Sequence, residues 1–276
     1  MKNVSHKVAV ILLTVAGVGL TTWLILRTDE PIYQGKPLTA WLKEYCADYD
    51  AYLAAHGVHA DPRVEEDFHS EALLAIRAIG TNALPVLLRM ARAKDHPIKA
   101  RFLKALRKSS LFSISFVSAE DHRTMACMGF YALGDQGQDA VPDLMAILSG
   151  PDIELKLTAA DCLGNIGPQA KTAVPSLLKL LDNTNRIVRW DATANLGKIR
   201  MEHEMVVPVL MTNLTTSNSI LGTTISTLGE FGASAKPAVP ALLKLLDHPD
   251  SYIRLETVDA LKRIAPETVS EFDQEQ

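Results

Sequence analysis

The sequence predicts an all-α protein, an α-solenoid of stacked helical hairpins that follows an N-terminal transmembrane helix. Three observations predict it. Aromatic residues make up only 6% of a chain that is 47% hydrophobic, which favours helices packed on helices over a sheet of β-branched and aromatic residues. A proline motif recurs about every 33 residues between positions 142 and 240. An apolar run without charges lies close to the N-terminus.

The apolar run extends from Val8 to Leu26 and contains no charged residue. At a rise of about 1.5 Å per residue, a helix of this length spans roughly 28 Å of a hydrocarbon core about 30 Å thick. Lys2 and Lys7 precede the run, and positive residues favour the cytoplasmic side of a membrane. We therefore expect a cytoplasmic segment at 1–7 and a single-pass signal-anchor helix at 8–26.

This orientation places the rest of the chain outside the cytoplasm. A cleaved signal peptide, which would give a secreted protein, is the alternative. The apolar region of a signal peptide normally has about 7 to 15 residues, and here the apolar sequence continues past Ala16 to Trp23. The longer run favours a retained anchor.

The segment after the anchor is expected to be a linker at 27–37, stiffened by Pro31 and Pro37. A capping helix and loop follow at 38–69. The apolar residues of this helix recur at helical spacing and are predicted to form its buried stripe: Leu38, Trp41, Leu42, Tyr45, Tyr49 and Leu53.

The repeat motif is a valine followed by a proline and an apolar run. The prolines are Pro142, Pro175, Pro208 and Pro240, at spacings of 33, 33 and 32 residues. Proline suits a first helical turn, where a backbone N–H has no intrahelical partner, so each proline is predicted to open a helix.

A glycine stands eight residues before three of these prolines, at Gly134, Gly167 and Gly232. Glycine tolerates the left-handed conformation that often ends a helix, so each glycine is predicted to be a left-handed cap of the preceding helix. One helical hairpin cannot bury its own apolar face, so consecutive hairpins must stack on one another.

The repeats are expected over residues 70–266, as five hairpin-like units and a terminal helix at Ser251 to Ile264. An acidic tail at 267–276 follows. Ser118 with Asp121 has the spacing of a capping box that opens a helix. The stack should present one extended curved surface, which we expect the second helices of the hairpins to make.

The motif resembles HEAT repeats, including the short variety of phycobilisome (PBS) lyase-like proteins. That family often carries an Asp after the second helix and an Arg in the next unit, as do Asp182 with Arg189 and Asp247 with Arg254. The resemblance weakens around residues 215–221, and at the first unit, where Gly80 precedes Pro85 by only five residues. The segment 33–42 is similar to the start of membrane-anchored bacterial HEAT-repeat proteins.

Sequence motifs for chemistry are missing from the chain. It has no GxxxxGK loop, GxSxG elbow or HExxH helix, the patterns that carry phosphate binding, nucleophilic or zinc chemistry. We therefore expect no catalytic residues and no cofactor. The predicted function is a membrane-anchored, non-enzymatic scaffold that binds a protein or peptide along its concave surface.

The alternative is a metal-dependent or tetrapyrrole-modifying HEAT enzyme. Its weak metal candidates are His56, His59, His203 and Glu204. Deoxyhypusine hydroxylase, an iron enzyme of similar repeats, uses His-Glu pairs from several units, whereas the pair at 203–204 occurs once here. We expect His203 to lie in an exposed loop. No residue identifies a bilin-lyase site.

One stretch of the chain is strongly basic. Its positive residues are Arg89, Arg92, Lys94, Lys99, Arg101, Lys104, Arg107 and Lys108, against Asp95 alone. Such a stretch is a solvated helix face or a contact for phosphate groups, with anionic lipid as a candidate partner. The net charge of −4 and a pI near 6.1 make nucleic acid an unlikely partner.

The chain has three cysteines, Cys46, Cys127 and Cys162. An odd number without CxxC spacing does not indicate a disulfide framework. Cys127 and Cys162 fall in apolar helical stretches, and we expect them to be buried thiols.

Overall fold

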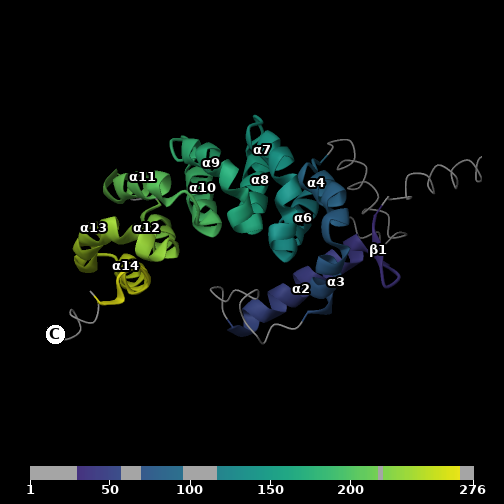
Figure 1. The fold of residues 1–276 in the computed structure, drawn as a ribbon, viewed down its shortest axis with the longest axis horizontal. Coiled ribbons are helices and arrows are strands. Elements are labelled where there is room, and N and C mark those ends of the chain that lie inside the picture. The colour runs from purple at the N-terminus through teal and green to yellow at the C-terminus, as the bar shows by residue number, and fades with distance from the viewer. Residues whose placement is uncertain (1–29, 57–69, 96–116, 217–219, 268–276) are drawn as a thin grey trace, which may run out of the picture.

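The computed structural model describes residues 30–56, 70–95, 117–216 and 220–267. These residues form an arch of stacked helical hairpins (Figure 1), so the all-α solenoid is confirmed. The first helices of the hairpins are α3 (Glu71–Ile79), α6 (Ala119–Leu133), α8 (Ile153–Ile166), α10 (Arg186–Ile199) and α12 (Leu221–Glu230). The second helices are α4 (Leu84–Ala91), α7 (Val141–Leu148), α9 (Val174–Leu180), α11 (His203–Thr216) and α13 (Val239–Leu243). A last helix, α14 (Ser251–Ile264), has the predicted bounds.

The segment before the first helix is a β-hairpin and not the stiff linker that its prolines suggested. β1 (Ile32–Tyr33) pairs with β2 (Lys36–Pro37) in antiparallel register. Gln34 and Gly35 between them have φ of 48° and 77°, the two positive values that a tight hairpin turn requires. The hairpin packs on the next helix, because the Trp41 Nε1–H donates to the carbonyl of Tyr33 at 3.1 Å.

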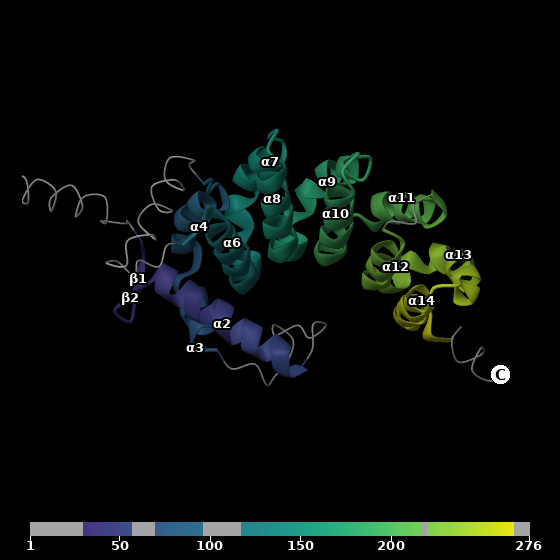
Figure 2. The same ribbon diagram turned by 180° about the vertical axis from the view of Figure 1, so that it is seen from behind.

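Helix α2 (Leu38–His56) runs beneath the first units and contacts α3 and α6, as Figure 2 shows. The first four residues of its predicted stripe are buried. Tyr49 and Leu53 are only half-buried, and Tyr52 is buried in their place. The buried face shifts along α2 because an α-helix has 3.6 residues per turn. Residues spaced four apart therefore point progressively away from a fixed neighbouring helix.

The connection inside each hairpin is a 3₁₀ helix and not a simple glycine turn. Three of these connections have the same length: η2 (Gly134–Ala140), η3 (Gly167–Ala173) and η4 (Gly232–Ala238). Their first glycines have positive φ, as predicted, but Gly134 and Gly167 have ψ of −124° and −141°. These values lie outside the left-handed helical region, so the predicted left-handed caps at Gly134 and Gly167 are wrong.

The shorter connection η1 (Gly80–Ala83) starts in the same way, since Gly80 has φ 59° and ψ −138°. From these 3₁₀ helices the chain enters α4, α7, α9 and α13, each with its proline in the first two positions, as predicted. The capping box at Ser118 and Asp121 is also present at the start of α6.

The fourth proline departs from the prediction. Pro208 lies inside α11, which begins five residues earlier at His203. The position eight residues before this proline holds Arg200 and not a glycine, and Arg200 adopts φ 53° and ψ 29°. No 3₁₀ helix follows Arg200, so the chain turns directly into α11 and the proline falls inside the helix.

The first helices line the inner, concave side of the arch, and the second helices lie on the outer side (Figures 1 and 2). This arrangement corrects the expectation that the second helices make the curved surface. Consecutive first helices from α6 to α14 pack extensively on one another, whereas α9 and α11 barely touch. The more closely spaced row must be the inner one.

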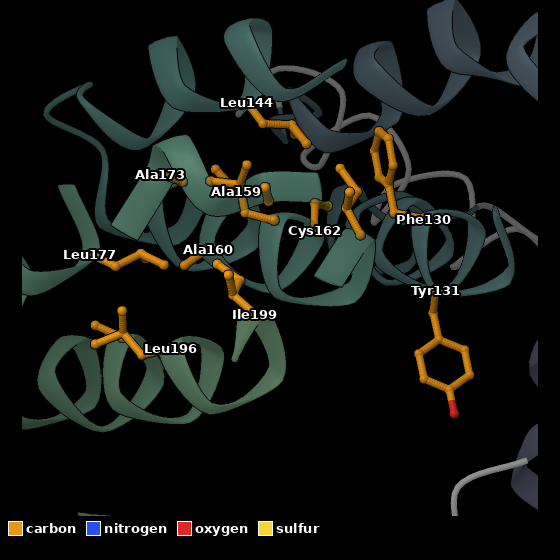
Figure 3. Packing of buried hydrophobic residues seen from close by; sticks show 14 of the residues in the cluster. Phe130, Tyr131, Leu144, Ala159, Ala160, Cys162, Ala173, Leu177, Leu196 and Ile199 are labelled. Atoms are coloured by element: carbon orange, nitrogen blue, oxygen red, sulfur yellow. The ribbon is translucent and has the colours of Figure 1, made fainter. Parts of the chain in front are cut away.

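Glycines on the first helices permit this close spacing. A Cβ on Gly229 of α12 would lie 3.2 Å from the Cα of Ala260 on α14, and a Cβ on Gly197 of α10 would lie 3.2 Å from Cγ2 of Thr227 on α12. Between the two rows, a continuous core joins the units, as Figure 3 shows for Phe130, Leu144, Leu177 and Leu196.

The predicted transmembrane helix at 8–26 lies outside the described residues. Within the described part of the chain, one helical stretch, Glu71–Ala91, is long and apolar enough to cross a membrane by length and composition. Half of its apolar window is buried in the protein, and Ile76 and Leu87 are fully buried. A core helix of a folded domain has the same character.

Candidate functional site

A group of large apolar side chains is exposed on the first helices. Its members are Ile153 on α8, Ile187 and Trp190 on α10, and Tyr252 and Leu255 on α14, each exposed by 47% to 68%. Single exposed apolar residues are common. Here, however, Ile187 and Tyr252 hold the same position in their units, two residues after the N-cap residues Asn185 and Asp250.

A groove of about 440 Å³ lies at the N-terminal ends of α10, α12 and α14. The residues that line it are Arg186, Ile187, Trp190, Ile220, Leu221, Gly222, Thr223, Asp250, Tyr252 and Ile253. Gly222 on α12 stands where α10 has Ile187 and α14 has Tyr252. Because Gly222 has no side chain, the ring of Tyr252 packs over it, and a Cβ there would lie 2.7 Å from Tyr252 Cε1.

The arginines of the predicted Asp and Arg pairs fix the edges of this groove. Arg189 Nη1 donates to the carbonyls of Asn183 and Thr184 at 2.7 and 3.0 Å. In α14, Arg254 Nη1 donates in the same way to the carbonyls of residues 248 and 249 at 2.7 and 3.0 Å. Each arginine thus ties the preceding turn to its helix, which holds the N-terminal ends of α10 and α14 in place.

The walls of the groove combine apolar side chains with polar groups, and polar atoms make up the larger share of the exposed lining. Arg186 and Asp250 contribute one charge of each sign, and both are exposed. Burial and the nearby carboxylates of Glu256 and Asp250 raise the pKa of Tyr252, so its phenol stays protonated and can donate a hydrogen bond.

A polar cluster lies between α8 and α10, in which Asn195 and Asp191 are buried and Lys198 is exposed. Asn195 Nδ2 donates to Asp161 Oδ1 at 3.2 Å and to the carbonyl of Asp191 at 3.0 Å. Lys198 Nζ is 3.7 Å from the same Asp161 oxygen and donates to Asn165 Oδ1 at 3.3 Å. Burial, and next the charge of Asp161, raise the pKa of Asp191 to about 8.

Only part of the predicted metal set lies in the described residues. His203 is exposed and begins α11, with Glu204 beside it, so it lies in a helix and not in the expected loop. His56 ends α2, while its side chain and all of His59 lie outside the described residues. Among the residues that the structure describes, no group of three or more His, Cys, Asp or Glu side chains could hold a metal ion.

Part of the basic stretch makes ion pairs with the next units. Arg92 pairs with Asp143 of α7, and Lys94 Nζ is 2.7 Å from Oδ2 of Asp152, the N-cap residue of α8. Arg89 is exposed. The remaining members, Lys99, Arg101, Lys104, Arg107 and Lys108, lie outside the described residues.

With this geometry in view, a protein-family model described as HEAT repeats matches residues 118–197 and 141–221. Residues 118–221 thus match HEAT repeats. The match runs from α6 to the start of α12, and it confirms the predicted resemblance over that region. The matched residues include α10, which forms one wall of the groove. The other wall is formed by α14, which lies beyond the matched residues. No curated protein matches the chain.

The groove residues were not predicted as a site. A signal for them exists in the sequence, since Ile187 and Tyr252 occur two residues after equivalent N-caps, off the buried stripe of their helices. Whether two such residues share a surface depends on the curvature of the stack.

Proposed function

We propose that this chain is a membrane-anchored, non-enzymatic HEAT-repeat scaffold whose groove on α10, α12 and α14 binds a segment of a partner protein. The observation that carries this proposal is the exposed pair Trp190 and Tyr252, which are 51% and 56% exposed on either side of Gly222. HEAT repeats generally serve protein interaction, and large aromatic residues supply most of the binding energy in many interfaces.

The groove favours a partner segment with an apolar anchor. A volume of about 440 Å³ accommodates one or two large side chains, which would contact the indole of Trp190 and the ring of Tyr252. Arg186 and Asp250 at the margin can pair with polar groups on either side of that anchor. A buried apolar centre with a polar rim is the usual anatomy of an interface.

The first prediction concerns partner capture. Replacing the groove residues Ile187 and Trp190 by Ala in full-length protein should weaken the binding of its partner at least tenfold, because truncation of a central interface residue costs about 2 kcal/mol or more. The measurement is quantitative capture of the partner from gently solubilised native membranes, followed by titration of that partner once it is identified.

The chain offers a matched control for this prediction. Leu74 on α3 is 66% exposed and Ile187 in the groove is 56% exposed, so Leu74→Ala removes a similar apolar side chain from a different surface. A Gly222→Leu variant should also lower binding, because its side chain displaces the ring of Tyr252 and fills the floor of the groove. Equal binding by Ile187→Ala, Leu74→Ala and wild-type protein would contradict the groove as the binding surface.

The anchor is the second part of this proposal. The uncharged run from Val8 to Leu26 and the preceding Lys2 and Lys7 support a single span with its N-terminus in the cytoplasm. We expect full-length protein to stay in membranes after alkaline extraction, and a chain that starts at residue 27 to be released. Release of the full-length protein, or a mature N-terminus beyond residue 16, would favour cleavage.

A further inference from the structure

Two cysteines of consecutive units lie side by side in the inner row of helices. Sγ of Cys127 on α6 is 3.5 Å from Sγ of Cys162 on α8. The sequence predicted two separate buried thiols. They are 35 residues apart, about one repeat length, and the packing of α6 on α8 brings them into contact. We propose that Cys127 and Cys162 are a modification site, a thiol pair that is oxidised to a disulfide cross-linking α6 to α8.

The backbones at this point are already held together. Asn165 Nδ2, one turn along α8 from Cys162, donates to the carbonyl of Cys127 at 3.0 Å. The Cys127 thiol also points to the carbonyl of Thr158 on α8 at 3.7 Å. Sulfur atoms already in contact need only about 1.5 Å more to reach a disulfide bond length of about 2.05 Å.

The two thiols differ in access. Cys162 is fully buried among core residues and lies on the side of α8 near Phe130 (Figure 3). Cys127 is half-buried, so a small oxidant in solution reaches it first. Burial raises the pKa of Cys162, which suits a second, resolving thiol and not the initial nucleophile.

Oxidation of the two thiols requires an electron acceptor, and a small disulfide such as oxidised glutathione can serve as one. The Cys127 thiolate attacks one glutathione sulfur, forms a mixed disulfide and releases one glutathione thiolate. Cys162 then loses its proton and attacks Sγ of Cys127, which expels the second glutathione. The two cysteines lose two protons and two electrons in total, and one glutathione disulfide becomes two thiols.

The cross-link lies apart from the binding groove. It joins the first helices of the units α6–α7 and α8–α9, whereas the groove is made by α10, α12 and α14. Loss of the disulfide therefore leaves the groove residues intact, and failure of the groove proposal leaves this one standing. Disulfides persist in oxidising compartments, so the cross-link is compatible with the proposed placement outside the cytoplasm but does not require it.

The test uses full-length protein in which Cys46 is replaced by Ser, equilibrated with oxidised and reduced glutathione. We expect oxidation to remove both reactive thiols, and digestion to yield one peptide pair linked through Cys127 and Cys162. A cross-link that closes a loop of this length should raise the melting temperature by roughly 5 °C relative to reduced protein. The second step should be faster at higher pH, because Cys162 must lose its proton.

The control variants are Cys127→Ser and Cys162→Ser, which should show no linked peptide and no redox dependence of melting. Two thiols that remain titratable in folded, oxidised protein would overturn the proposal. Glutathione that stays on Cys127 without forming the cross-link would also overturn it. The thiol count on the Cys46→Ser protein decides the question even where a second substitution impairs folding.

Discussion

The free energy of unfolding is expected to fall by roughly 3 kcal/mol between pH 5 and pH 8, because a proton held by Asp191 in the folded state has to be given up. Asp191 is only 5% exposed, and its pKa is raised to about 8 by burial and by the charge of Asp161. An unfolded aspartate titrates near pH 3.9. In the interval between the two values, the folded protein binds one more proton than the unfolded chain.

The direction of the pH dependence follows from this difference in bound protons. The stabilisation by the protonated carboxyl is fully present below the unfolded pKa and is lost as the pH rises through the folded pKa. The groups that face Asp191 are Asp161 of α8, which raises the pKa, and Lys198 and Asn195 of α10, which lower it. A side-chain hydrogen bond with Asp161 also favours the protonated form of Asp191 and raises its pKa.

Urea denaturation at a series of pH values measures this effect. Asp191→Asn should be more stable than the wild type at pH 8 and should flatten the profile, since its side chain carries no charge to desolvate. Asp182→Asn is the matched control, because Asp182 is exposed on the turn after α9. A wild-type profile that is flat from pH 5 to pH 8, or one that Asp191→Asn leaves unchanged, would refute the assignment.

Replacement of Gly164 by Val is expected to destabilise the protein by about 3 kcal/mol or more, through overpacking and a broken polar cluster. A Cβ on Gly164 would lie 2.2 Å from Oδ1 and 3.0 Å from Cβ of Asn195 on α10. Asn195 is fully buried and held by its bonds to Asp161 and to the Asp191 carbonyl. It cannot move aside without leaving those groups unpaired, so α8 and α10 must separate.

The same denaturation experiment tests this prediction. Ala146→Val is the control, because Ala146 is exposed on α7. This substitution reports only the lower helix propensity of a β-branched residue, which costs less than about 1 kcal/mol. A double substitution, Gly164→Val with Asn195→Ala, should recover part of the loss, since it removes the side chain that the new Cβ meets. If Gly164→Val costs no more than Ala146→Val, the close contact between these inner helices is wrong.

These two sites show why the repeats make a firm scaffold. The inner helices approach one another through glycines, and the space between them holds a polar cluster that fits in one arrangement. A groove on such a row keeps its shape before a partner arrives, which reduces the ordering cost of binding.

Much of the fold was readable from the sequence, because the repeat is a local signal. A proline that suits the first turn of a helix and a glycine at positive φ both act through their own backbone, so the hairpins follow from their spacing. The same holds for the capping box at Ser118 and the helix at Ser251–Ile264. Local signals were misleading where the same residues are compatible with two conformations. Pro31 and Pro37 suggested a linker, but the turn at Gln34 and Gly35 closes a β-hairpin.

Other features depended on contacts between units. The sequence by itself determined the class of fold, the period of the repeat and the lack of known catalytic motifs. Tertiary structure alone decided that the first helices line the concave side, that Gly222 opens a groove between Trp190 and Tyr252, and that Cys127 meets Cys162. Each of these depends on how closely helices some 33 residues apart approach one another, and that distance is set by side chains on both helices together.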